Sequence, residues 1–229
     1  MMLAKLKKEV CRANLELVRH GLVTLTFGNV SGVDRRRGLV VIKPSGTPYS
    51  ALKPNRMAVV RLADGAALEG GRPSSDTPTH LALYRAFEPV GGIVHTHSPW
   101  AAAWAQAERE IPVLGTTHAD HFLGPVPCTR RLGPEEVADR YEAATGAVIV
   151  ERFAKLDPRN LPAVLVAGHG PFAWGPDPAA AVENAAVLEL VARLAGQTLQ
   201  LAPETGPIDQ ALLARHFFRK HGPGAYYGQ

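Results

Sequence analysis

Short apolar runs alternate with longer segments of helical spacing along this chain, and this alternation constrains the fold more than any other feature. The apolar runs predict strands at residues 22–27, 38–43, 57–62, 163–168 and 172–174. Helical spacing predicts helices over residues 3–17, 134–144 and 207–220, and a cap residue before proline predicts helix starts at Thr77, Ser98 and Asp177. Because strands and helices interleave and several strands are hairpin-like neighbours, we expect an α/β fold with a mixed sheet covered by helices.

Length and composition exclude several classes of protein. The 229 residues fit one compact domain over residues 1–229, and apolar residues at 46% with charged residues at 20% are ordinary for a globular protein. A net charge of +4 without a basic face argues against a nucleic acid partner, although it suits an anionic small molecule. Cys11 and Cys128 cannot form a disulfide framework, and no apolar stretch reaches the roughly 18 residues of a membrane span. We therefore expect a cytoplasmic protein with no membrane partner.

Two histidines, His95 and His97, end an apolar run in the segment GGIVHTHS. On a strand, residues i and i+2 point to the same face, so the two imidazoles would lie side by side, as metal ligands do. Histidines flanked by apolar residues are more often hydrogen-bonded structural groups, so the pair alone leaves both interpretations open.

A third histidine, His169, also ends an apolar run and lies between Gly168 and Gly170, which give the backbone room to bend. Three imidazoles with an exchangeable position are typical of a catalytic zinc-type site, whereas structural sites usually include cysteine. The absence of paired cysteines therefore favours catalysis if a metal binds. Spacing alone leaves the alternative that His169 only lines a turn.

The segment RPSSDTPTHLALY places Ser74, Ser75 and Asp76 immediately before an expected helix. Free N–H groups and the helix dipole make such a position favourable for an anion, and Asp76 is a candidate metal ligand or base. The alternative is a capping segment in which these side chains bond the backbone of the helix start.

Two further segments could contact an anion. In KPSG, Lys43 supplies charge while Ser45 and Gly46 supply donors, although the same residues also form an ordinary turn. In FGNVSG, Asn29 adds an amide. Each segment is weak evidence alone, but three in one chain indicate an anionic ligand. The segment GTTHADHF adds Asp120 as a candidate proton carrier, while a tyrosine as close to the end as Tyr227 would ordinarily be dismissed as part of a frayed terminus.

Seven segments, in chain order, carry a resemblance to a known family: GNVSGVD, VIKPSG, PSSDTPTHLALY, GGIVHTHS, GTTHADHF, LVAGHGPFAWG and RKHGPGAYYGQ. Together they resemble the class II aldolase/epimerase family, and within it the epimerase members. The resemblance runs from the first expected helix to the last residue. It implies a three-layer fold with a largely antiparallel central sheet.

The resemblance also implies a role for each matching residue. It implies that a zinc-type divalent ion, or another such as Mn²⁺ or Co²⁺, is held by Asp76, His95, His97 and His169. It implies substrate and phosphate contacts from Gly28, Asn29, Lys43, Ser45, Gly46, Ser74 and Ser75. Asp120 and Tyr227 match the family's acid/base pair, which reaches the metal from a neighbouring subunit of a ring-shaped homotetramer, and Thr116, Glu142 and His216 match secondary positions of the site.

The implied activity is metal-dependent C4 epimerisation of L-ribulose 5-phosphate to D-xylulose 5-phosphate, by cleavage and re-formation of the C3–C4 bond. The nearest alternative is a sugar-phosphate aldolase of the L-fuculose-1-phosphate type. Those aldolases carry glutamate where this chain has Asp76 and lack the terminal AYYGQ, and both differences favour the epimerase. A zinc hydrolase would use the same histidines without phosphate loops, and a non-enzymatic assembly module of the same fold would lack the metal histidines.

Overall fold

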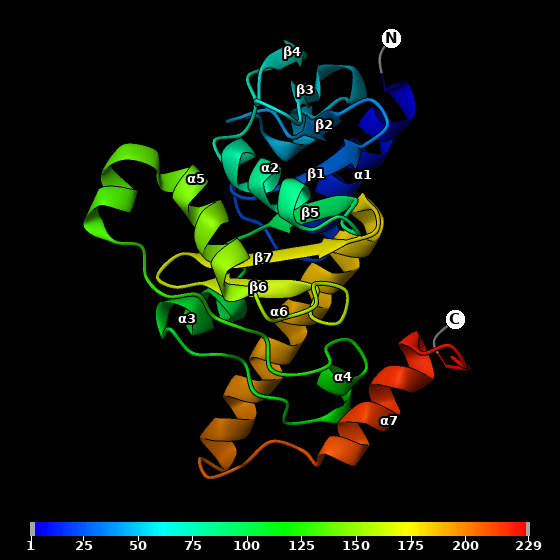
Figure 1. Ribbon diagram of the computed structural model, residues 1–229, viewed down its shortest axis with the longest axis vertical. Helices are drawn as coiled ribbons and strands as arrows, with labels where there is room; N and C mark the ends of the chain where they lie inside the picture. Colours follow the sequence, from blue (N-terminus) through cyan, green and yellow to red (C-terminus); the bar gives the residue numbers. More distant parts are fainter. Residues whose placement is uncertain (1–2, 228–229) are drawn as a thin grey trace.

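A computed structural model describes residues 3–227 (Figure 1). The helices are α1 (Ala4–Arg19), α2 (Thr77–Ala86), α3 (Pro99–Gln106), α4 (Thr116–Ala119), α5 (Pro134–Arg152), α6 (Pro178–Leu201) and α7 (Gln210–His221), with short 3₁₀ turns at Tyr49–Ala51 and Pro54–Arg56. The strands are β1 (Asn29–Asp34), β2 (Leu39–Ile42), β3 (Ala58–Arg61), β4 (Ala67–Glu69), β5 (Gly92–His95), β6 (Ala163–Val166) and β7 (Gly170–Gly175). Within this described part, no helix is both long and apolar enough to cross a membrane.

The strands form one sheet in the order β4-β3-β2-β1-β5-β7-β6, and each neighbouring pair is antiparallel. A parallel contact occurs at the isolated bridge between Cys128 and Leu165. Figure 1 shows α2 and α5 on one side of the sheet and α1 and α6 on the other, which confirms the expected sheet covered by helices. The short α4 packs against α7 at one end of the molecule, near the carboxyl terminus.

The main core lies between these layers and includes Trp174, Tyr84 and Phe172, each almost entirely buried. A smaller cluster packs α1 onto β2 and β3 and contains Tyr49. Asp177 caps α6 as predicted, because its carboxylate accepts from the amides of Ala179 and Ala180 at 2.8 and 2.9 Å.

The predicted strand at residues 22–27 is wrong. The amide of Leu22 bonds the carbonyl of Leu17 at the end of α1, and Leu25 adopts a left-handed φ of 55° that no continuous strand tolerates. The side chains of Leu25 and Phe27 are mostly exposed rather than paired with a neighbouring strand. The segment is therefore a loop, and pairing begins only at Asn29.

Other boundaries move without changing the element. The helix predicted over 134–144 continues to Arg152 and is kinked at Arg140, whose φ of −159° and ψ of 51° are not helical. The strand predicted over 163–168 ends at Val166, because Gly168 turns the chain with a φ of 70°. That turn places His169 between β6 and β7.

Candidate metal and phosphate site

Three histidines at or next to the ends of neighbouring strands converge at one point. His95 is the last residue of β5, His97 follows in the segment before α3, and His169 lies in the turn between β6 and β7. Their ring centroids are 4.7 to 5.1 Å apart, and one nitrogen from each lies within 4.8 Å of the others. Because β5 pairs with β7, the sheet itself brings residues 95 and 169 together although 74 positions separate them.

The chemical state of these histidines suits a divalent ion. The Nδ1–H of His95 donates to the carbonyl of Pro171 at 3.0 Å, which leaves Nε2 as a lone pair facing Nε2 of His97 at 3.1 Å. Burial lowers the pKa of His95 to about 3 and also lowers that of His169, so both are neutral at physiological pH. The two Nε2 atoms lie within hydrogen-bonding distance, and a divalent cation would take the place of a proton between them. The three side chains can therefore hold a divalent metal.

Gly170 lets the hairpin approach the histidine strand. A Cβ at this position would lie 2.9 Å from the carbonyl oxygen of Thr96, too close for any larger residue without a shift of the backbone. The same Cβ would lie 3.6 Å from the ring of His97. Close packing at the site therefore requires glycine at position 170, in addition to the backbone bend expected from the sequence.

Asp76 borders the same cavity but is outside the group of three histidines. One of its carboxylate oxygens accepts a hydrogen bond from the amide of Asn29 at 2.6 Å. Burial by itself would raise the pKa of Asp76, but His95, His80 and the Asn29 amide lower it overall, so the group is a carboxylate. That Asp76 is a further metal ligand stays a prediction.

A cavity of about 290 Å³ joins the histidines to the predicted anion segments. Its lining includes all the substrate and phosphate positions expected from the sequence: Gly28, Asn29, Lys43, Ser45, Gly46, Ser74 and Ser75. Sequence reasoning missed Thr26 and Phe27, which also line it, and the ring of Phe27 stacks on His97 with centroids 6.1 Å apart. Their position directly before Gly28 and Asn29 was the available signal.

The anion side of the cavity is built around Lys43. Its ammonium donates to the carbonyl of Thr26 at 3.0 Å and lies 4.8 Å from the centre of the Tyr49 ring. Burial lowers the pKa of Lys43, and the negative charge of Asp76 partly offsets this. The cavity therefore combines one buried cation with serine hydroxyls next to the start of α2, a chemistry suited to a phosphate.

A second group of candidate residues lies elsewhere, and we call it the Asp120 cluster: Asp120, His216, Arg219 and Tyr227. The carboxylate of Asp120, next to α4, accepts from Arg219 at 3.0 and 3.1 Å and lies 3.0 Å from Nδ1 of His216, both on α7. The guanidinium of Arg219 lies 4.0 Å from the centre of the Tyr227 ring. None of these residues, nor Thr116, lines the cavity within one chain. Arg219 was missed by the sequence analysis.

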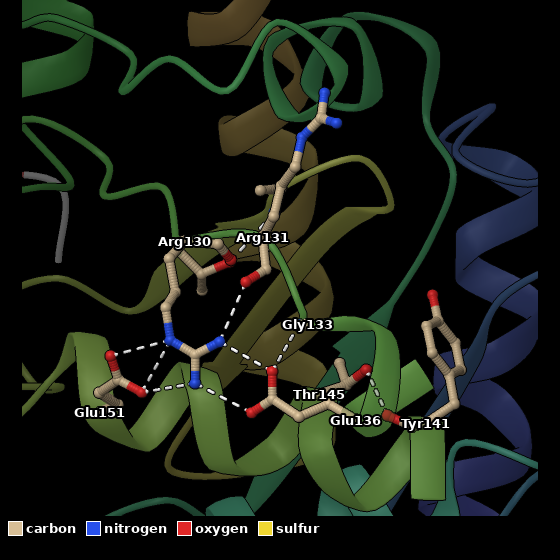
Figure 2. Close-up of polar contacts among 9 residues, drawn as sticks. Arg130, Arg131, Gly133, Glu136, Tyr141, Thr145 and Glu151 are labelled. Atoms are coloured by element: carbon tan, nitrogen blue, oxygen red, sulfur yellow. Dashed lines mark hydrogen bonds and ion pairs between the residues drawn. The ribbon is translucent and has the colours of Figure 1, made fainter. Parts of the chain in front are cut away.

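The kinked α5 brings a further side chain to the histidines. Figure 2 shows Arg130 bonded to Glu136 in the first part of α5 and to Glu151 in the second, while Glu136 also accepts from the Gly133 amide. Just after the kink, the half-buried Tyr141 lies with its ring centroid 5.7 Å from that of His169. The neighbouring Glu142 is outside the cavity lining, and its backbone carbonyl accepts from Thr79 at 2.6 Å.

Comparison with known proteins agrees with this geometry. Residues 8–195 match the family model described as Class II Aldolase and Adducin N-terminal domain. Proteins named L-ribulose-5-phosphate 4-epimerase UlaF, from Salmonella paratyphi C (strain RKS4594) and Salmonella typhi, are each 56% identical over 226 residues, covering 98% of this chain and 99% of each relative.

Among solved structures, an L-fuculose 1-phosphate aldolase superposes with a TM-score of 0.77 at 23% identity, covering 92% of this chain and 95% of its own. YgbL from Escherichia coli, described as a putative aldolase/epimerase/decarboxylase, superposes with a TM-score of 0.74 at 25% identity over 94% of this chain and 99% of its own. The aldolase likeness supports the fold alone. The chain belongs to the class II aldolase family, whose model covers most of its length.

Proposed function

We propose that this chain interconverts L-ribulose 5-phosphate and D-xylulose 5-phosphate by inverting the configuration at C4. One observation carries the proposal: a single cavity places three converging imidazoles beside a buried lysine and serine hydroxyls. The imidazoles can hold a metal that binds the oxygen atoms of a sugar, and the lysine and serines can bind a phosphate. The printed names of the 56% identical relatives support the same reaction.

The position of C4 dictates the chemistry. The hydrogen on C4 is not adjacent to the C2 carbonyl, so its removal would give no stabilised carbanion. Cleavage of C3–C4 avoids this, because it yields the enediolate of dihydroxyacetone and the aldehyde glycolaldehyde phosphate. A divalent ion such as Zn²⁺, held by His95, His97 and His169 with Asp76 as a further ligand, would supply a Lewis acid for the negative charge, an effect worth several kcal/mol.

The anion side of the cavity retains the aldehyde while it rotates. Lys43 and the hydroxyls of Ser45, Ser74 and Ser75 would hold the phosphate at C5, so that the aldehyde turns about this fixed end. Re-addition to the opposite face then forms the other C4 epimer. Release of the aldehyde before re-addition would instead make the protein an aldolase.

Two proton carriers are required on opposite faces of C4. We assign these roles to Asp120 and Tyr227: one removes the proton of the C4 hydroxyl during cleavage, and the other returns a proton after rotation. Within one chain both lie outside the cavity, and the Tyr227 side chain is 48% exposed. We therefore place them at the cavity of a neighbouring copy in a homotetramer, together with Thr116 and His216, while Glu142 contributes a secondary contact from α5.

The test is a coupled assay that follows D-xylulose 5-phosphate formed from L-ribulose 5-phosphate, while free glycolaldehyde phosphate is measured in the same sample. We expect the epimer with little free aldehyde, and loss of the activity on treatment with a chelator that is reversed by added Zn²⁺ or Mn²⁺. Free aldehyde without the epimer would identify a sugar-phosphate aldolase. Activity that survives complete metal removal would contradict the proposed chemistry.

A further inference from the structure

We infer that Tyr49 is a positioning residue that sets the affinity of the cavity for phosphate, although it is not among the residues that line the cavity. Its hydroxyl donates to two consecutive backbone carbonyls, those of Phe27 at 2.7 Å and Gly28 at 3.0 Å. Both carbonyls belong to the loop that forms one wall of the cavity. The inference rests on the proposed function only for the identity of the phosphate ester.

Tyr49 also supports the cation opposite that loop. The ammonium of Lys43 lies 4.8 Å from the centre of the Tyr49 ring and donates to the carbonyl of Thr26 at 3.0 Å. Tyr49 therefore contacts two parts of the cavity wall. Its hydroxyl bonds the loop at residues 27 and 28, and its ring faces the ammonium of Lys43. Three consecutive carbonyls, of residues 26 to 28, are fixed by these two side chains.

The ring of Tyr49 is anchored where it cannot move easily. Tyr49 is only 7% exposed and lies in the small core that packs α1 onto β2 and β3, with neighbours that include Val10, Val41 and Met57. The hydroxyl emerges from this core at the loop. Tyr49 is packed in the core through its ring and bonds the cavity wall through its hydroxyl, so it fixes the position of the wall relative to the core.

Residues 22–27 of this loop form no strand, so the hydrogen bonds from Tyr49 are among the contacts that hold it in place. Gly28 adopts a φ of 77°, and a Cβ there would meet the carbonyl of His95 at 2.9 Å and Val23 at 2.8 Å. The loop is thus enclosed between the end of the histidine strand and Tyr49. Without the hydroxyl, two carbonyls lose their donor, and the wall is free to shift away from the phosphate position.

The experiment measures binding of inorganic phosphate to the metal-loaded full-length protein by calorimetry. Tyr49→Phe removes only the hydroxyl, and we expect it to weaken phosphate binding by about tenfold, the effect of one or two lost hydrogen bonds. Tyr84→Phe is the matched control, because Tyr84 is also a buried tyrosine, and its hydroxyl bonds Ser31 at 2.8 Å, away from the cavity lining. Lys43→Met should abolish phosphate binding and locates the anion at this site.

A kinetic arm separates positioning from a general loss of structure. For L-ribulose 5-phosphate, Tyr49→Phe should raise KM by about tenfold with kcat changed by less than about twofold. For unphosphorylated L-ribulose, kcat/KM should equal that of the wild type. Replacement of Tyr49 by para-aminophenylalanine restores a donor at the same place and should return phosphate affinity to within about threefold of the wild type.

Each outcome of these experiments either supports or overturns the role of Tyr49. A folded Tyr49→Phe protein with unchanged phosphate affinity overturns the inference, as does an equal loss with the unphosphorylated sugar. If Tyr49→Phe does not fold, the para-aminophenylalanine variant decides: near-normal phosphate affinity supports the role, and affinity as poor as that of Lys43→Met overturns it. Phosphate binding that depends on Tyr49 in a protein without epimerase activity would reject the proposed reaction and leave this inference standing.

Discussion

At the scale of single residues, burial fixes protonation states that the sequence does not reveal. His118 of α4 is almost fully buried against Phe122, and its Nε2–H donates to the carbonyl of Gly124 at 2.8 Å. Burial lowers the pKa of His118 to about 4, below the value of about 6.5 in an unfolded chain. The folded protein therefore keeps this imidazole neutral at pH values where the unfolded chain would bind a proton.

This difference predicts a pH-dependent stability. Because the unfolded chain binds the proton first, the stabilisation is fully present above pH 6.5 and is lost as the pH falls towards 4. His118→Gln should remove about 2 kcal/mol of the decrease in unfolding free energy between pH 7 and pH 5. Urea unfolding at a fixed protein concentration measures it, and His20→Gln, at an exposed position after α1, is the control. An unchanged pH dependence in His118→Gln would contradict the assignment.

The family resemblance predicted the residues that line the cavity, whereas residue types and spacing alone left other interpretations open, and neither predicted the residues that support the cavity. The histidines and the segments around Asn29, Lys43 and Ser74 were expected because their sequences match the family's segments, and all of them line the cavity. Tyr49 and Arg219 were not, since each acts through a neighbour that is distant in sequence: Arg219 bonds Asp120 across 99 positions. A single sequence carries no signal for such a contact.

At the scale of elements, α5 shows how an ion pair can hold a distorted helix. Arg130 lies before the helix yet bonds Glu136 at 2.8 Å and Glu151 at 2.9 Å, on either side of the kink at Arg140 (Figure 2). Tyr141 follows the kink and approaches His169. The pattern of helical spacing predicted the beginning of this element, whereas its kink and length depend on tertiary ion pairs that spacing cannot encode.

Removal of the clamp should loosen the first part of α5 without unfolding the protein. In Arg130→Met, we expect faster amide hydrogen exchange over residues 134–141, with little change in the unfolding free energy because the ion pairs are exposed. Arg159→Met is the control, since it removes an exposed pair with Asp157 in another loop. Exchange that is unchanged over 134–141, or raised equally throughout the chain, would show that the clamp has no local role.

At residues 22–27, the sequence pattern predicted the wrong element. Its alternation of apolar and polar residues fits a strand, but a strand also requires a partner, and β1 already lies between β2 and β5. The segment instead forms the loop that reaches the cavity. The apolar Phe27 is exposed there and faces His97, so a residue that suggested sheet pairing lies at the site.

At the scale of the whole molecule, our proposal places the acid/base pair and the cavity that it serves on different copies of the chain, because neither Asp120 nor Tyr227 lines the cavity of its own chain. The prediction is subunit complementation. The His97→Asn and Asp120→Asn proteins should each be inactive, whereas mixed oligomers should recover about one quarter of wild-type activity, because a heterologous ring with random order pairs an intact cavity with an intact Asp120 at that frequency. Assays after mixing, unfolding and refolding measure the recovery. Asp120→Asn alone should retain its metal. No recovery in verified mixed oligomers would place both groups on one chain.

The separation of the Asp120 cluster from the cavity also bears on the life of a newly made chain. Glycolaldehyde phosphate is a reactive aldehyde that modifies amines, so an enzyme that cleaves before it can re-form the bond is hazardous. An unassembled chain would bind the sugar phosphate but lack the proton carriers needed to cleave it. Assembly would then protect the cell from the free aldehyde, because bond cleavage would begin only in the oligomer, where the complete site retains glycolaldehyde phosphate.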